Sequence, residues 1–135
     1  MDDKGRVIIP LRFRNELGNI FIITKGLDKC LFVYREKDFQ DMEAQLMSQP
    51  ALDRHTMRLQ RWFSAEAVET QVDSQGRVAI PSNLRDFASI EEEVAIVGAG
   101  HRIEVWSRVG WDAFNASLSD EDIMQSAVEV GLSKL

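Results

Sequence analysis

A nine-residue motif occurs twice in this chain, and this internal repeat constrains the fold more than any other feature of the sequence. Residues 2–10 read DDKGRVIIP and residues 73–81 read DSQGRVAIP, which are identical at six of nine positions at an offset of 71. Further along, residues 31–34 (LFVY) match residues 103–106 (IEVW) at an offset of 72, so the copies differ by one loop residue. A repeat that keeps its register over so long a stretch predicts two tandem copies of one structural half.

Each copy has the pattern of a tight turn followed by short strands and a helical turn. Asp-x-x-Gly fits a type I turn, and the Asp side chain can accept hydrogen bonds from the backbone of the turn. Short apolar runs then predict strands, and Gly98-Ala99-Gly100 predicts a hairpin turn between the last two. The expected strands are 7–9, 20–24 and 30–34 in the first copy and 78–80, 94–97 and 103–106 in the second, with helical turns near Phe13 and at 82–87.

Apolar residues at helical spacing predict four longer helices. The first runs from Lys37 and stops before Pro50, and the second follows Leu52. The third starts near Arg108, and the last follows Ser119, a candidate N-cap with acids in the first turn after it. Their apolar stripes are expected to face the core or a subunit interface: Phe39, Met42 and Leu46; Thr56, Leu59 and Phe63; Trp111, Phe114 and Leu118; Ile123, Ala127 and Val130.

The two copies differ in what precedes the motif. Val68, Thr70 and Val72 alternate before Asp73 as in a strand, whereas only Met1 precedes the motif of the first copy. We therefore expect the first copy to lack a strand that the second copy has. This difference should leave a sheet edge of the first copy unpaired.

Charge is segregated along the chain. The formal net charge is −6, which opposes binding to a polyanion. Yet residues 4–14 and 54–61 contain basic residues and no acidic residue, while acidic residues collect at 91–93 and 120–122. A basic face on an acidic protein is one interpretation of this pattern, and ordinary solvated surface is the other.

The sequence favours a cytoplasmic location. Cys30 is the single cysteine, so no intrachain disulfide can form, and we expect it to be a small core residue. No apolar run approaches the roughly 20 residues that a membrane span needs. Residues 1–4 lack the apolar core of a signal peptide.

The motif Asp-x-x-Gly-Arg-x-x-Ile-Pro, followed by a short helix that bears an arginine, resembles the AbrB-type swapped-hairpin family of transcription factors. Two copies, with Gly26-Leu27-Asp28, Arg61-Trp62-Phe63 and Glu104-Val105-Trp106 in place, resemble the MraZ family in particular. The resemblance implies an α+β, β-rich fold in which two tandem AbrB-like halves form one small double-split β-barrel with helices packed outside. Its parts would be a first repeat at 1–50, a linking helix at 51–65, a second repeat at 66–118 and a C-terminal helix at 119–135.

The same resemblance implies a function. It predicts a regulator of the division and cell-wall gene cluster that binds short repeated G-rich boxes in double-stranded DNA and associates with the nucleoid. It also predicts a ring-shaped homo-oligomer of roughly eight or more subunits, with no membrane and no small-molecule substrate as partners. An antitoxin-like or pure assembly protein of the same superfamily is the alternative.

Candidate DNA contacts follow from the repeated motif. Arg6 and Arg77 come directly after the glycine of each turn, and the planar fork of an arginine matches O6 and N7 of guanine. From the residues alone, these arginines could instead form structural ion pairs that brace two turns. Arg108 lies outside the motif and is not expected to contact DNA. The full set of candidates is Arg6, Arg77, Lys4, Arg12, Arg14 and Arg85 for DNA contact and Asp2, Gly5, Asp73 and Gly76 for forming the turns.

Nothing in the sequence matches an enzyme. His55 and His101 lie in no catalytic or metal-ligand motif, and there is neither a nucleophile elbow nor a phosphate-binding glycine loop. We therefore expect no catalytic residue, no metal and no cofactor. Arg54, Arg58 and Arg61 fall on one face of a helix, where solvated surface, subunit contact and DNA contact all remain open.

Overall fold

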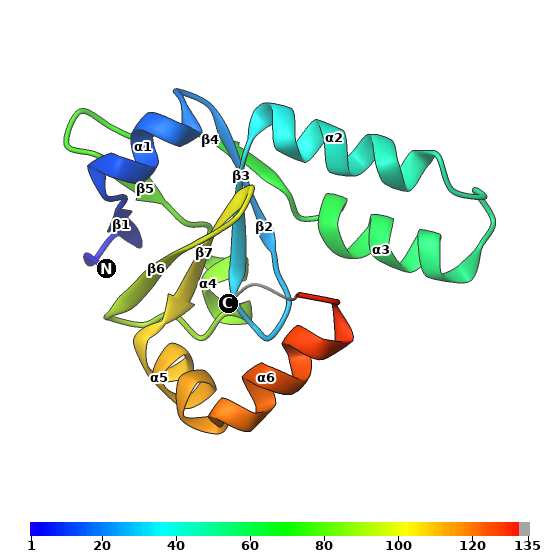
Figure 1. Cartoon of the computed structure of the whole chain (residues 1–135). Helices are drawn as coiled ribbons and strands as arrows, with labels where there is room; N and C mark the ends of the chain where they lie inside the picture. The colour runs from blue at the N-terminus through cyan, green and yellow to red at the C-terminus, as the bar shows by residue number, and fades with distance from the viewer. Residues whose placement is uncertain (133–135) are drawn as a thin grey trace.

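The computed structural model of the chain describes residues 1–132 as a mixed α+β fold (Figure 1). Each element expected from the sequence is present, with bounds close to those expected. The expected hairpin turn is displaced: Gly98 and Ala99 belong to a strand, and the left-handed φ of +69° falls at Gly100. The elements are β1 (Arg6–Ile8), α1 (Leu11–Leu17), β2 (Phe21–Lys25), β3 (Leu31–Arg35), α2 (Glu36–Met47), α3 (Arg54–Ser64), β4 (Val68–Thr70), β5 (Arg77–Ala79), α4 (Ser82–Phe87), β6 (Val94–Ala99), β7 (Arg102–Ser107), α5 (Arg108–Ser117) and α6 (Asp120–Glu129).

The strands of the two repeats interleave. Within residues 1–132 they form a two-stranded ribbon, β1–β5, and a five-stranded antiparallel sheet in the order β4-β2-β3-β7-β6. Equivalent strands, one from each repeat, pair at the centre of each sheet: β1 pairs with β5 at Val7↔Val78, and β3 pairs with β7. The larger sheet departs from this symmetry only in β4, which lies outside β2 and has no counterpart beside β6 among residues 1–132. The expected double-split barrel is not confirmed, because no strand pairing in the described part of the chain joins the ribbon to the sheet or closes either one.

Both faces of the five-stranded sheet are buried. Side chains alternate between the two faces along each strand, so each face packs against a different set of elements. One face, which includes Val33, packs against the ribbon residues Val7 and Val78 and against α1 and α4. The opposite face carries aromatic residues such as Phe32 and packs against α2, α3 and α5. Cys30 lies in this second cluster, as expected, and burial raises the pKa of its thiol to about 12. The ribbon is therefore held by its inner face, and its outer face lies at the surface.

The strand that precedes the second motif serves the first repeat. β4 pairs with β2 at Phe21↔Thr70 and Ile23↔Val68. The expectation of an unpaired edge in the first repeat is therefore wrong, because the strand of the second repeat crosses over to cover it. The two edge strands of the sheet are β4 and β6, and β6 is the counterpart of β2 in the second repeat. The amino group of Met1 donates a hydrogen bond to the Glu92 carbonyl, close to the start of β6.

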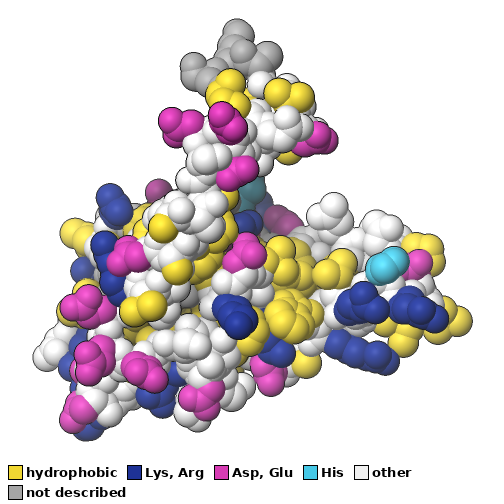
Figure 2. Space-filling model, turned by 90° about the horizontal axis from the view of Figure 1, so that it is seen from below, with side chains coloured by type: hydrophobic (Ala, Val, Ile, Leu, Met, Phe, Trp, Pro, Cys, Tyr) yellow, Lys and Arg dark blue, Asp and Glu magenta, His cyan; other side chains and the backbone are white. Residues whose placement is uncertain are grey.

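The longer helices form two pairs outside the sheet. Helix α3 is fixed to β2 by the Thr24 hydroxyl, which donates to the Phe63 carbonyl at 2.6 Å. Helix α6 starts with the expected N-cap, a capping box between Ser119 and Asp122. Within α6 only Ala127 is buried, so the apolar stripe of this helix does not join the core of the single chain. Figure 2 shows this end of the chain projecting from the body, with acidic side chains along it.

Candidate nucleic-acid interface

The ribbon brings the two copies of the motif together. Val7 and Val78 pair at its centre and point into the core, where they are 2% and 1% exposed. Because side chains alternate along a strand, the residues on either side of each valine point outward. The outer face of the ribbon therefore carries Arg6 and Ile8 from β1 and Arg77 and Ala79 from β5. The sequence predicted two separate turns, and the structure makes them one surface.

Each turn holds its arginine through the aspartate that starts the motif. Oδ1 of Asp2 accepts hydrogen bonds from the backbone N–H groups of Lys4 and Arg6, both at 2.9 Å. Oδ2 of Asp2 accepts a hydrogen bond from Nε of Arg6 at 2.7 Å. The hydrogen bond from the Arg6 backbone is the main reason that the pKa of Asp2 lies below its ordinary value.

The second turn repeats this geometry. Asp73 accepts from the backbone N–H groups of Gln75 and Arg77 at 2.8 and 2.9 Å and from Nε of Arg77 at 2.8 Å. Its pKa is likewise lowered, chiefly by the backbone of Arg77. The ion pairs expected as an alternative to DNA contact are therefore present. They engage only the Nε side of each guanidinium, so ion pairing within the turn and contact through the terminal nitrogens are compatible.

The two arginines line one hollow on the surface. Nη1 of Arg77 lies 3.8 Å from Oδ2 of Asp2, so the first turn contributes charge to the second. The hollow also includes Ile8, Glu93 and Arg108. Sequence reasoning had placed Arg108 outside the site. Its backbone N–H donates to the Glu93 carbonyl at 3.0 Å, which extends the β6–β7 hairpin by one pair beyond Val94↔Ser107 and places the start of α5 beside the ribbon hollow.

Arg14 and Arg85 each lie against the turn of the opposite repeat. A Cβ built on Gly76 would stand 2.5 Å from Nη1 of Arg14, and one built on Gly5 would stand 2.7 Å from Cζ of Arg85. Both glycines have a left-handed φ, +73° at Gly5 and +76° at Gly76, so the motif needs glycine for its conformation and for this close approach. The guanidinium groups of Arg14 and Arg85, which the sequence made candidates for DNA contact, thus lie directly against the turns.

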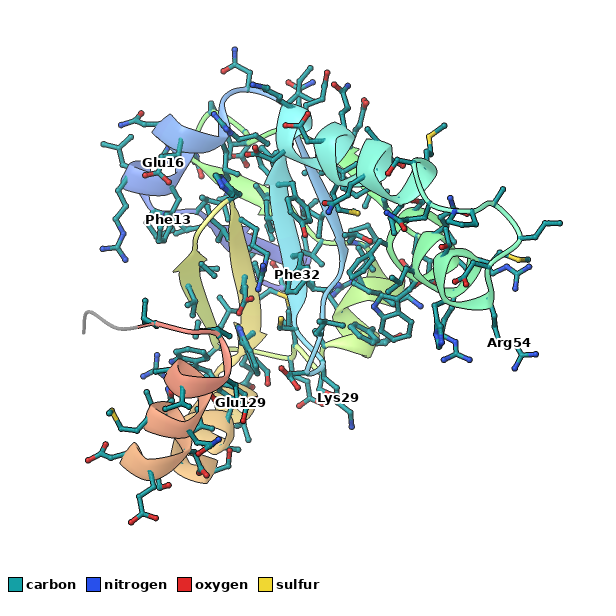
Figure 3. All side chains as sticks on the ribbon, turned by 45° about the vertical axis from the view of Figure 1, so that its right-hand side comes forward. Phe13, Glu16, Lys29, Phe32, Arg54 and Glu129 are labelled. Atoms are coloured by element: carbon teal, nitrogen blue, oxygen red, sulfur yellow. The ribbon has the colours of Figure 1, made fainter. Side chains whose placement is uncertain are left out.

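The remaining basic candidates differ in position. The side chain of Lys4 is exposed on the first turn, and the guanidinium of Arg12 lies over the ring of Phe13 at 4.6 Å. Arg54, Arg58 and Arg61 form a basic stripe on α3, beside Trp62. Figure 3 places Arg54 at the far end of the α2–α3 pair, on the opposite side of the molecule from Phe13. The structure therefore does not bring this stripe together with the ribbon.

The described residues contain no cluster of three or more His, Cys, Asp or Glu side chains suited to a metal ion. None of the helices described, α1 to α6, is long and apolar enough to cross a membrane. His55 lies on α3 and His101 in the β6–β7 turn, so the two histidines stay apart.

Comparison with known proteins identifies the family. The family model described as "MraZ protein, putative antitoxin-like" matches residues 1–62 and again residues 63–130. The chain is 43% identical over 134 residues to "Transcriptional regulator MraZ" of Thermoanaerobacter pseudethanolicus, covering 98% of this chain and 94% of the relative. It is 46% identical over 121 residues to the protein of the same name from Moorella thermoacetica, covering 90% and 85% of the two chains. These matches span both repeats at high identity, and the chain therefore belongs to the MraZ family.

Proposed function

We propose that this protein is a transcriptional regulator that binds double-stranded DNA through the outer face of its β1–β5 ribbon. The observation that carries the proposal is the pairing of the two motif copies, which presents Arg6 and Arg77 side by side on one surface. A two-stranded β-ribbon fits the major groove of B-DNA. The relatives that bear the name transcriptional regulator support the same function.

The held geometry of the arginines suits base or phosphate recognition. Each guanidinium donates its Nε–H to the aspartate of its own turn, which leaves its terminal nitrogens to donate to guanine O6 and N7 or to phosphate. Of these, Nη1 of Arg77 also lies 3.8 Å from Oδ2 of Asp2, beyond hydrogen-bond distance. Arg6 and Arg77 are diagonal neighbours across the ribbon, roughly 7–8 Å apart by the usual spacing of such positions. That separation corresponds to about two base-pair steps of about 3.4 Å. We therefore expect the two arginines of one subunit to contact neighbouring positions of one short box.

Oligomer formation would supply what a single acidic chain lacks. One subunit offers a single ribbon and carries a net charge of −6, whereas several linked ribbons would raise the local concentration of contacts. Two surfaces suit a head-to-tail contact: the basic stripe Arg54, Arg58 and Arg61 of α3, and the acidic, apolar helix α6 with exposed Ile123 and Val128. A head-to-tail contact closes into a ring when the rotation permits. A ring of roughly eight or more subunits is the form that the family resemblance implies.

The setting would be the nucleoid of the cytoplasm, and the target would be G-rich boxes upstream of the division and cell-wall gene cluster. A mobility-shift titration tests this with DNA that carries short G-rich direct repeats and a scrambled duplex of equal length. Specific binding should exceed binding to the scrambled duplex at both low and moderate salt, while both weaken as salt rises. Equal affinity for the two duplexes at moderate salt would contradict sequence-specific binding.

Antitoxin activity is a second candidate, favoured by the exposed apolar side chains of α6. Met124 is 53% exposed and Val128 is 69% exposed, as suits a helix that binds another protein. Stoichiometric co-purification of a small basic protein, lost when Met124 and Val128 are both replaced by Ser, would support this function. Retention of the partner after these substitutions would exclude α6 as its binding site.

A further inference from the structure

Arg14 and Arg85 are related by the same symmetry as the two motifs, and each reaches across it. The guanidinium of Arg14, from α1 of the first repeat, covers Gly76 in the second turn. The guanidinium of Arg85, from α4 of the second repeat, covers Gly5 in the first turn. Each turn is therefore contacted on one side by its own aspartate and on the other by an arginine of the opposite repeat.

From this geometry we propose that Arg14 and Arg85 are positioning residues that act crosswise. Arg14 holds the turn that presents Arg77, and Arg85 holds the turn that presents Arg6. This inference rests on the proposed function, in which Arg6 and Arg77 contact DNA. It adds that each repeat depends on the other for the orientation of its DNA-contacting side chain.

The placement of these two arginines is not that of ordinary ion pairs. Among the described residues, no carboxylate forms a salt bridge with either guanidinium. Nε of each is buried and has no hydrogen-bond partner. A buried N–H donor without a hydrogen-bond partner is unfavourable. A side chain that only filled this space would not need to carry such a donor. The contact with the glycine backbone is the feature that distinguishes these positions, and it is made twice.

Backbone bonds cross between the repeats at the same places. The Ile9 N–H donates to the Gly76 carbonyl at 3.0 Å, and the Ile80 N–H donates to the Gly5 carbonyl at 3.0 Å. Each turn is thus tied to the opposite repeat through its glycine, both by this bond and by the guanidinium over it. A turn held in this way loses less conformational entropy when its arginine binds a ligand, which strengthens binding.

Double-mutant cycles in DNA binding test the crosswise dependence. Arg77→Ala should weaken specific binding about tenfold, and Arg14→Gln about fivefold. The Arg14→Gln/Arg77→Ala double variant should bind within about twofold of Arg77→Ala alone, because Arg14 acts through Arg77. Arg14→Gln combined with Arg6→Ala should instead show the product of the two single losses. Arg85→Gln should give the mirror result, coupled to Arg6 and independent of Arg77.

Arg12→Gln is the matched control, since Arg12 is the exposed neighbour of Arg14 on the same helix. It should weaken binding equally in every background. If Arg14→Gln multiplies the losses of both Arg6→Ala and Arg77→Ala, Arg14 contacts DNA itself and the positioning role is wrong. If Arg14 couples to Arg6 instead, the dependence lies within a repeat and the crosswise assignment is wrong.

Amide hydrogen exchange without DNA separates this inference from the proposed function. Arg14→Gln should speed exchange in residues 73–77 several-fold and leave residues 2–6 unchanged, and Arg85→Gln should do the reverse. Unchanged exchange in both turns would overturn the inference. If exchange responds crosswise while Arg6→Ala and Arg77→Ala leave DNA affinity unaltered, the hold on the turns stands, and both the proposed DNA contact and the positioning role fail.

Discussion

Replacing Gly76 by alanine should weaken DNA binding without unfolding the protein, and the matched change at Gly100 should not affect binding. Both glycines have a left-handed φ, +76° at Gly76 and +69° at Gly100, so alanine is strained at either position. They differ in their surroundings. A Cβ at Gly100 has no atom within 4 Å, whereas a Cβ at Gly76 would lie 2.5 Å from Nη1 of Arg14.

The two effects can be separated by size. Left-handed strain costs alanine about 1–2 kcal/mol at both positions. At Gly76 the end of the flexible Arg14 side chain must also move away, which gives up contacts of about 0.1–0.2 kcal/mol per atom pair. This loss is partly offset because the unpartnered Nε of Arg14 gains water. The free energies of unfolding of the two variants should therefore differ by less than about 1 kcal/mol.

The assay compares urea unfolding with DNA affinity for Gly76→Ala and Gly100→Ala. Gly76→Ala should lose roughly 1–3 kcal/mol of specific binding, the size of one arginine contact, while Gly100→Ala binds as wild type. Equal DNA affinity in the two variants would show that Gly76 serves the turn conformation only. A much larger loss of stability at Gly76 than at Gly100 would show that Arg14 is wedged in place and cannot move aside.

Three further predictions follow from the fold. Ser89 has a left-handed φ of +55° where the first repeat has Gly18, so Ser89→Gly should raise the free energy of unfolding by about 1 kcal/mol, and an unchanged melting temperature would refute this. An alternating segment patterned on residues 66–72 and fused before Met1 should pair with β6 and protect its amides from exchange, whereas protection of β2 would contradict the assigned edge. The depressed pKa values of Asp2 and Asp73 mean that their hold on the turns is complete above the ordinary Asp pKa of about 3.9 and is lost as the pH falls through the lower folded values. Exchange in the turns should therefore not respond to these groups between pH 7 and 5, and a rise in exchange in that range that Asp2→Asn abolishes would contradict it.

The repeat made much of the fold predictable, because short-range patterns specify short-range structure. Apolar alternation and turn residues placed the strands, and Ser119 with its acids placed the start of α6. Which strands pair with each other was harder to predict from the sequence. The expected edge in the first repeat was wrong because β4 crosses to β2, a pairing between residues about fifty positions apart that local pattern does not encode.

In the candidate site, too, the local features were predictable from the sequence and the contacts between distant segments were not. The sequence singled out both arginines and both glycines of the motif, because glycine in a tight turn has a local physical cause. It could not show that the two turns meet across the β1–β5 pairing, nor that Arg108 lines the same hollow. It assigned Arg14 and Arg85 to DNA contact from their charge and their place in the repeated motif, whereas the contacts that define them lie in the opposite repeat. These contacts arise because the two repeats pack against each other symmetrically, and that packing can be seen only in the folded chain.

The most direct test of DNA binding by the ribbon is the affinity of Arg6→Ala and Arg77→Ala for a G-rich direct-repeat duplex at moderate salt. Arg35→Ala is the matched control, because Arg35 also donates from Nε to an aspartate, Asp38, at 2.6 Å but lies at the end of β3, outside the ribbon. Each ribbon variant should lose roughly 1–3 kcal/mol of specific binding at unchanged oligomer size, while Arg35→Ala binds as wild type. Wild-type affinity in both ribbon variants would show that Arg6 and Arg77 brace their turns and do not contact DNA.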